Sequence, residues 1–215
     1  MQHIILLGDS IFDNKSYVDG GLDVVLHLRQ QMPDGWKATL RAVDGSVVEN
    51  VQKQTLDLPA DATHLFVSVG GNNAILNADV LQMKVSSSAE VFDRLADLAS
   101  SFEFHYREML QSVLSLNKPT TVCTIYYPRI PEAFAQKIAV AALATFNDVI
   151  IKQAFLAGVP LIDLRLVCNE NSDYANEIEP SEAGGGKIAK AVLRVVAEHN
   201  FEEHKTKVFF QLRQD

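Results

Sequence analysis

The 215-residue chain has few cysteines, no strong cluster of basic residues and no long apolar run. Its two cysteines, Cys123 and Cys168, lack the spacing of a metal site or a disulfide framework, so we expect reduced thiols and no metal. The 27 acidic residues outnumber the 19 lysines and arginines, which argues against a nucleic-acid partner. No segment approaches the ~20 apolar residues of a membrane span, and the N-terminus lacks the pattern of a secretion signal. We therefore expect a cytoplasmic protein without a membrane partner.

Short apolar runs alternate with longer segments of helical periodicity. The apolar runs predict strands at 3–8, 37–43, 64–69, 120–126 and 159–163. The periodic segments predict helices near 18–31, 46–54, 89–116, 132–156 and 182–198. Such repeated strand–helix units predict one α/β domain over residues 1–200, with a parallel sheet covered by helices on both faces.

The C-terminal tail, residues 201–215, combines charged residues with the apolar sequence Val208-Phe209-Phe210. This pattern predicts either an extra strand or a docking segment for a partner subunit. An exposed apolar strand edge would favour a homo-oligomer.

The first candidate site lies where the first predicted strand ends. The apolar run is followed by Gly8-Asp9-Ser10, which places a hydroxyl at the carboxyl end of the strand. Open α/β sheets bind their substrates at this end, where backbone N–H groups stabilise negative charge. Ser10 is therefore a candidate nucleophile. The alternative is an ordinary strand-to-helix turn in which Asp9 and Ser10 only satisfy backbone N–H groups.

Two more segments containing glycine follow predicted strands. Gly45 comes after the run 37–43, and Gly70-Gly71-Asn72-Asn73 closes the run 64–69. A parallel sheet brings these three strand ends to one edge. The N–H groups of Ser10 and Gly45 and the side-chain amide of Asn72 can then form an oxyanion hole for acyl transfer.

In these three segments the chain resembles the SGNH/GDSL hydrolases. Gly8-Asp9-Ser10 matches the nucleophile block of that family, Gly45 the second block and Gly70-Gly71-Asn72-Asn73 the third, in order and with matching spacing. The resemblance implies a flavodoxin-like three-layer α/β/α sandwich with strand order 2-1-3-4-5 and about five parallel strands. It also implies hydrolysis of a small ester through an acyl-enzyme on Ser10, without a cofactor.

The fourth block of the family is altered in this chain. The family has an aspartate followed three positions later by a histidine, where this sequence has Asn176 and Glu179. None of the six histidines is well placed by the predicted elements. We therefore expect a carboxylate to replace the usual base: Glu179 first, if burial raises its pKa, and Asp173 second. The alternative for Glu179 is a cap or an ion pair at the start of the last helix.

Substrate contacts are expected from the loops above the sheet edge. Asn73, Tyr126 and Tyr127 are the candidates, and the segment 74–88 could form a wall over Ser10. The two tyrosines could instead pack beneath the loop, and Arg129 is an alternative contact for an anionic substituent. Because the usual acid and base are missing, the alternative function is binding of a small acyl or sugar ligand without turnover. A flavin-binding flavodoxin is a third, weaker alternative, because the first loop lacks a run of Ser and Thr.

Overall fold

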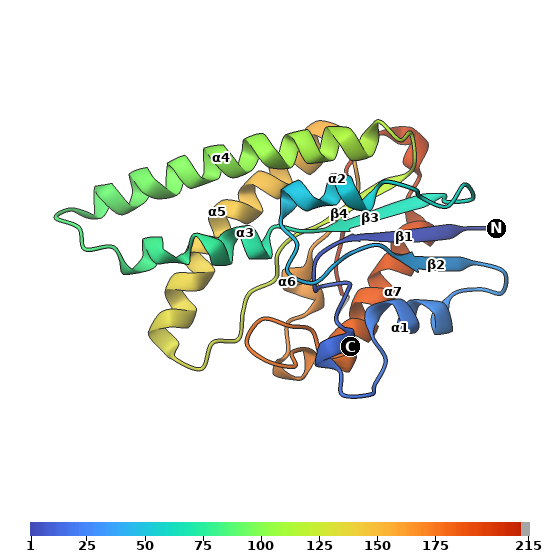
Figure 1. Cartoon of the computed structure of the whole chain (residues 1–215), viewed down its shortest axis with the longest axis horizontal. Helices are drawn as coiled ribbons and strands as arrows, with labels where there is room; N and C mark the ends of the chain where they lie inside the picture. Colours follow the sequence, from blue (N-terminus) through green and yellow to red (C-terminus); the bar gives the residue numbers. More distant parts are fainter. Residues whose placement is uncertain (212–215) are drawn as a thin grey trace.

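The computed structural model describes residues 1–211 and is built around a parallel sheet (Figure 1). Its six strands lie in the order β2-β1-β3-β4-β5-β6. They are β1 (His3–Gly8), β2 (Lys37–Leu40), β3 (His64–Ser68), β4 (Thr120–Cys123), β5 (Leu161–Ile162) and β6 (Val208–Phe209). The order of the first five strands confirms the flavodoxin-like prediction, and the sixth strand extends it.

Helices cover both faces of the sheet, as the α/β/α prediction requires (Figure 1). The α-helices of the described residues are α1 (Val24–Gln31), α2 (Val51–Gln54), α3 (Gly71–Leu76), α4 (Ser88–Leu114), α5 (Ala133–Ala157), α6 (Leu164–Val167) and α7 (Glu182–Glu198). The interior strand β1 is buried along its whole length, which explains its continuous apolar sequence.

Alternating residues of β1 divide the core into two halves. Ile4 and Leu6 pack with residues of α1 and α7, whereas Ile5 and Leu7 pack with residues of α2, α4 and α5. All four side chains are fully buried. Burial of a side chain of this size stabilises the fold by about 1.5–3 kcal/mol, so both helix layers are held to the same strand.

The long helices α4 and α5 extend beyond the carboxyl ends of the strands (Figure 1). Their buried side chains begin only at Phe102 in α4 and at Phe146 in α5. The first half of each helix therefore has no sheet beneath it. These halves form part of the wall of the cavity described below.

Helix α5 corrects one expectation from the sequence. Among the helices of the described residues, only α5 is long and apolar enough to cross a membrane, judged by length and composition. The expectation that no segment approaches the ~20 apolar residues of a membrane span is therefore wrong. Many of its apolar residues are alanines, and polar residues such as Lys137 and Asn147 interrupt them, so the run is not conspicuous in the sequence. In this fold α5 packs against α4 and β4.

Several predicted elements differ in extent from the observed ones. The helix expected from residue 18 begins only at Val24, because Asp23 caps it by accepting a hydrogen bond from Leu26 N–H at 2.8 Å. Strand β5 has only two residues, since Pro160 has no N–H and Asp163 already caps α6. The segment 74–88, expected to be a loop, includes the end of α3 and a 3₁₀ helix, Ala78–Gln82.

The C-terminal tail contributes to the sheet. Val208 and Phe209 pair in parallel with Leu161 and Ile162 of β5. Of the two roles expected for this tail, the extra strand is therefore confirmed. The last four residues of the predicted tail, 212–215, lie outside the described residues.

Candidate active site

The ends of β1 and β2 are joined by a buried network behind Ser10. Gly8 has φ of +125°, and a Cβ there would lie 1.8 Å from the carbonyl oxygen of Ser68, so only glycine fits. The buried Gln54 accepts from Gly8 N–H at 2.7 Å and donates to the Gly8 carbonyl at 2.8 Å. It also donates to Ser46 Oγ at 3.2 Å. Gln54 therefore fixes the turn that carries Ser10 relative to the loop that carries Gly45, a role that no sequence motif indicated.

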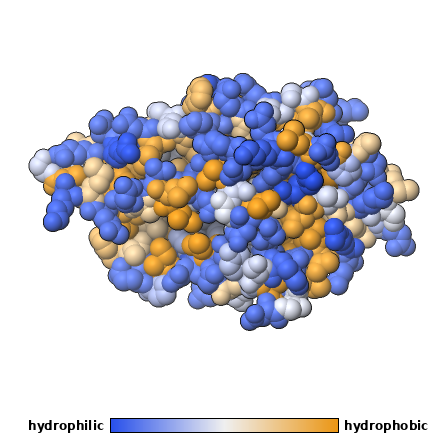
Figure 2. All heavy atoms as spheres, viewed as in Figure 1, coloured by the Kyte–Doolittle hydropathy of each residue, from blue (hydrophilic) through white to orange (hydrophobic). Residues whose placement is uncertain are grey.

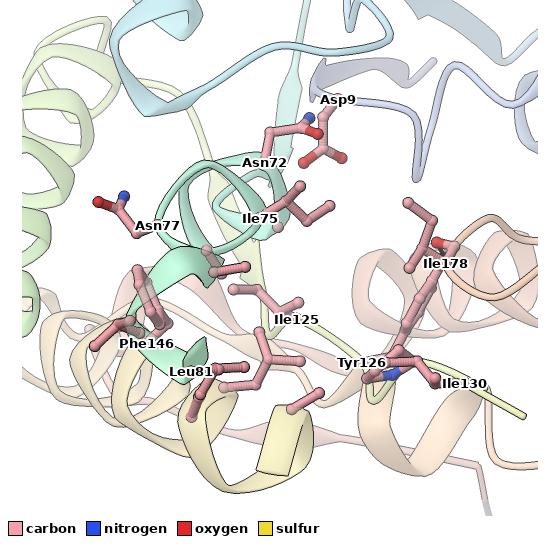
Figure 3. A pocket seen from close by; sticks show the side chains of 18 of the residues that line it. Asp9, Asn72, Ile75, Asn77, Leu81, Ile125, Tyr126, Ile130, Phe146 and Ile178 are labelled. Carbon is pink, nitrogen blue, oxygen red and sulfur yellow. Dashed lines mark hydrogen bonds between the residues drawn. The ribbon is translucent and has the colours of Figure 1, made fainter. Parts of the chain in front are cut away.

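A cavity of about 330 Å³ has Ser10 in its lining. Figure 3 shows side chains that line it. Most of its walls are apolar and come from α3, the 3₁₀ helix Ala78–Gln82, and the first halves of α4 and α5. Ser10, Asn72 and Glu179 all line it, so the structure brings these three predicted site residues together. Residues of the segment 74–88 form one wall, with Ile75 and Leu81 pointing into the cavity (Figure 3).

Glu179 is buried next to Ser10, with 6% of its surface exposed. Burial raises the pKa of its carboxyl to about 7, although hydrogen bonding with the Ser10 side chain opposes the rise. Its Oε2 atom is buried and has no hydrogen-bond partner among the described residues. A carboxylate with this pKa and this neighbour can accept the serine proton near neutral pH.

Side-chain hydrogen bonds hold the loop that carries Glu179. Asn176, which replaces the aspartate of the family, accepts from the N–H groups of Ile178 and Glu179, both at 2.9 Å. Asn14 is fully buried and donates to the carbonyl of Pro180 at 3.1 Å, and its Oδ1 accepts from Val24 N–H at 2.9 Å. Asn14 therefore connects the turn after Ser10 to the loop of Glu179.

The capping alternative for Glu179 is wrong. Helix α7 is capped by Ser181, whose Oγ accepts from Gly184 N–H at 3.2 Å. Within residues 1–211, Glu179 takes part in no ion pair. The carboxyl of Glu179 is therefore not used by the cap of α7 or by an ion pair among these residues.

A second buried carboxyl group, Asp9, also lines the cavity beside Asn72 (Figure 3). Burial raises its pKa to about 7, against the effect of a 3.1 Å hydrogen bond from Ile11 N–H, and the negative charge of Glu179 raises it further. Asp9 accepts from the N–H of Ile11, as expected for an ordinary strand-to-helix turn. Ser10 does not cap the following helix, α1, because Asp23 does so. Sequence reasoning gave Asp9 only a structural role, because burial was not visible in the motif.

The candidate oxyanion donors differ in their present partners. Within the described residues, the N–H groups of Ser10 and Gly45 donate to no acceptor. Gly45 is exposed and does not line the cavity; its φ is +77°, and no atom lies within 4 Å of the position that its Cβ would occupy. The Asn72 amide donates to the Ser46 carbonyl at 2.9 Å, which leaves its second hydrogen for a ligand.

Besides Gly45, three predicted site residues lie outside the cavity lining. Asp173 is fully buried but is bound by Lys187 at 2.7 Å, so it does not face Ser10. Asn73 accepts from Val48 N–H at 3.1 Å and does not line the cavity. Tyr127 is likewise absent from the lining, whereas Tyr126 lines it and donates from its hydroxyl to the carbonyl of Ile178 at 2.5 Å. For Asp173 and Asn73, the reason is a partner outside the cavity.

Arg129 and the histidines lie outside the cavity lining as well. The Arg129 guanidinium donates to the Asn169 carbonyl at 2.7 Å and lies 4.9 Å from the ring centre of Tyr174. None of the six histidines, all of which are described, lines the cavity. Across residues 1–211, no group of three or more His, Cys, Asp or Glu side chains is arranged to hold a metal ion.

Solved structures with this fold include several lipolytic enzymes. The lipase Lip_vut3 from a goat rumen metagenome has a TM-score of 0.71 at 15% identity, over 94% of this chain and 100% of that one. A member of the lipolytic G-D-S-L family from Veillonella parvula has a TM-score of 0.67 at 16% identity, over 93% and 100%. Phospholipase A1 from Streptomyces albidoflavus has a TM-score of 0.64 at 18% identity, over 90% and 98%. At these identities, the likeness shows a shared fold.

No curated protein sequence gives a significant match to this chain. The model of the GDSL-like lipase/acylhydrolase family matches residues 6–185, which include Ser10, Gly45, Asn72 and Glu179. The matched range supports a hydrolase of ester substrates as the general class of activity. This chain belongs to the GDSL-like lipase/acylhydrolase family.

Proposed function

We propose that this protein hydrolyses esters of apolar acids through an acyl-enzyme on Ser10, with Glu179 as the general base. The observation that carries the proposal is the position of Ser10, which lies between a buried carboxyl with a pKa near 7 and an apolar cavity of about 330 Å³. A carboxylate with its ordinary pKa is a weak base toward a serine hydroxyl, so the raised pKa of Glu179 matters.

In the first half of the reaction, Ser10 Oγ forms a bond to the acyl carbon and its proton passes to Glu179. The electron pair of the carbonyl moves to oxygen, where the N–H groups of Ser10 and Gly45 and the amide of Asn72 would stabilise the charge. Collapse of this intermediate breaks the ester C–O bond, and the departing alkoxide takes the proton from Glu179. Water then attacks the acyl-enzyme with the same base, which releases the acid and restores Ser10.

A second candidate function is binding of an acyl ligand without turnover. The observation that favours it is the absence of every histidine from the lining of the cavity. Imidazole returns a proton to a leaving group more readily than a carboxylate, so a Glu-based site has less catalytic power.

Fluorophosphonate labelling followed by peptide mapping separates the two candidates, because covalent capture requires an activated hydroxyl. We expect label on Ser10, and a loss of about 10⁴-fold or more in ester hydrolysis in Ser10→Ala. Ser100→Ala, at an exposed position on α4, is the matched control and should label and turn over normally. Absence of label at every pH, with ligand binding retained in Ser10→Ala, would instead support binding without turnover.

A further inference from the structure

Asp9 is a buried carboxyl group of the cavity lining that the proposed mechanism does not use. Only 3% of this residue's surface is exposed. Its Oδ1 atom accepts from Ile11 N–H at 3.1 Å, and its own N–H donates to the Ser68 carbonyl at 3.1 Å. Among the described residues, no donor is hydrogen-bonded to Asp9 Oδ2. A buried carboxyl oxygen without a partner is costly, so Oδ2 indicates a partner that arrives with the substrate.

The surroundings of Asp9 Oδ2 leave room for such a partner. Figure 3 shows the carboxyl oxygens of Asp9 directed toward the space beside Ile75. A Cβ at Gly71 would lie 4.0 Å from Oδ2 and 3.9 Å from Ile125 Cγ2. The φ angle of Gly71 is not in the left-handed region, so the backbone does not require glycine at this first position of α3. The missing side chain instead leaves space next to Oδ2.

Asp9 lies at the end of the cavity where the acyl carbonyl would sit. It directly precedes Ser10 in the chain and lies beside Asn72, whose amide is one of the proposed oxyanion donors (Figure 3). The first halves of α4 and α5 contribute apolar side chains to the lining, among them Leu95 and Ala139. An acyl group bonded to Ser10 would therefore pass Asp9 with its first carbons and reach these helices with its later ones.

A hydroxyl group suits Asp9 Oδ2 better than an amine or a methylene. Burial raises the pKa of Asp9 to about 7, so both protonation states of this carboxyl are present near neutral pH. A hydroxyl donates to the ionised form and accepts from the protonated form, whereas an ammonium group suits the ionised form alone. A methylene leaves Oδ2 without a partner in both forms.

We infer that the preferred acyl group carries a hydroxyl on its second or third carbon, which hydrogen-bonds with Asp9 Oδ2 in the space beside Gly71. The inference rests on the proposed function and names its substrate class, which is esters of hydroxy acids whose remaining chain is apolar. In this arrangement Asp9 determines specificity, while Ser10 and Glu179 carry out the chemistry.

The test compares ethyl hexanoate with its 2-hydroxy, 3-hydroxy and 6-hydroxy derivatives. Each kcat/KM is divided by the rate constant for hydroxide hydrolysis of the same ester, which removes differences in intrinsic reactivity. A cavity without a polar partner favours the plain ester, because a hydroxyl must lose its water on entry. We instead expect the 2-hydroxy or the 3-hydroxy ester to exceed the plain ester by about tenfold or more, and the 6-hydroxy ester to gain nothing.

Variants locate this preference at Asp9. Asp9→Leu keeps the branched shape without the oxygens and should abolish the preference, whereas Asp9→Asn keeps a hydrogen-bonding group and should retain most of it. Gly71→Ala adds a methyl group next to Oδ2 without a clash and should reduce the preference. Asp34→Leu makes the same change as Asp9→Leu at an exposed position in the connection before β2 and should leave the preference unaltered.

Each ratio is measured within one protein preparation, so partial loss of folded protein cancels. The inference is overturned if neither the 2-hydroxy nor the 3-hydroxy ester is preferred. It is equally overturned if the preference survives in Asp9→Leu or, should that variant not fold, in Gly71→Ala.

Calorimetry of Ser10→Ala with hexanamide and with 2-hydroxyhexanamide and 3-hydroxyhexanamide tests the same contact without turnover. We expect one of the two hydroxy amides to bind more tightly than hexanamide, and tighter binding by neither would contradict the inference. Failure of the proposed function is recognised separately, by no label on Ser10 and no hydrolysis of any ester in the series.

Discussion

The two sides of Ser10 are built in different ways. The polar side consists of short turns at the ends of β1, β2 and β3 together with the loop of Glu179, and it carries carboxylates and backbone donors. The apolar side consists of helices that come from distant parts of the sequence, and its surface is visible as apolar patches around a hollow beside α3 (Figure 2). Under the proposed function, the polar side carries out the chemistry and the apolar side selects the substrate.

After Ser10→Ala, the largest effect is expected from Glu179→Gln, which removes the base from the polar side. We expect kcat to fall by about 10²–10⁴-fold, the usual contribution of a general base. Because the base acts when ionised and its pKa is raised to about 7, wild-type activity should rise with pH through about 7. The variant should lose this limb of the pH profile.

The matched control for Glu179→Gln is Glu177→Gln, at an exposed position two residues earlier in the same loop. It makes the same chemical change without touching the cavity, so both kcat and the pH profile should stay as in the wild type. Steady-state kinetics from pH 5 to pH 9 on one uncharged ester measures both variants. A Glu179→Gln enzyme with normal kcat would remove Glu179 from the mechanism.

A smaller effect concerns stability and the other buried carboxyl of the polar side, Asp9. Its folded-state pKa of about 7 lies above its ordinary value, so the folded protein holds this proton more tightly than the unfolded chain. The resulting stabilisation is complete below about pH 4 and is lost as pH rises through about 7. We expect the free energy of unfolding to fall by roughly 1–3 kcal/mol between pH 5 and pH 8 on account of Asp9.

Asp9→Asn should flatten this dependence, because the amide has no proton to lose. Urea denaturation at pH 5 and pH 8 measures the two slopes, and Asp34→Asn should keep the wild-type slope. An unchanged stability slope in Asp9→Asn would mean that Asp9 is ionised in the folded protein throughout this range.

The same division explains what could be predicted from sequence. The strand order followed from the family resemblance, and Ser10, Asn72 and Glu179 were found because each belongs to a short local motif or a position beside one. Asp173 was chosen from the same local alignment. Its partner Lys187 lies on the following helix, α7, and the sequence does not show which side of that helix faces Asp173. Burial of Asp9 and the bridging role of Gln54 depend on packing between distant segments, which no local pattern reports.

The apolar side was harder to foresee because its residues are ordinary core types. An apolar stripe along a helix such as α4 is typical of a core-facing side, yet Leu95 and Leu98 line the cavity, since the first half of the helix extends beyond the sheet. In α5 the lining includes several alanines, which leave space and carry no chemical signal. A cavity is an absence of side-chain volume, so it becomes visible only when the helices are placed.

The smallest expected effect is a change of preference on the apolar side. Ala142 lines the cavity one turn before Phe146, and Ala142→Phe would fill space that an acyl chain needs. We expect the preferred acyl chain to shorten and kcat/KM for the longer esters to fall by about tenfold, as loss of a few buried methylenes implies. Ala141→Phe makes the same change at an exposed position and should leave the preference unaltered. Kinetics over a series of p-nitrophenyl esters would measure this, and an identical chain-length profile in the two variants would place the acyl group outside this cavity.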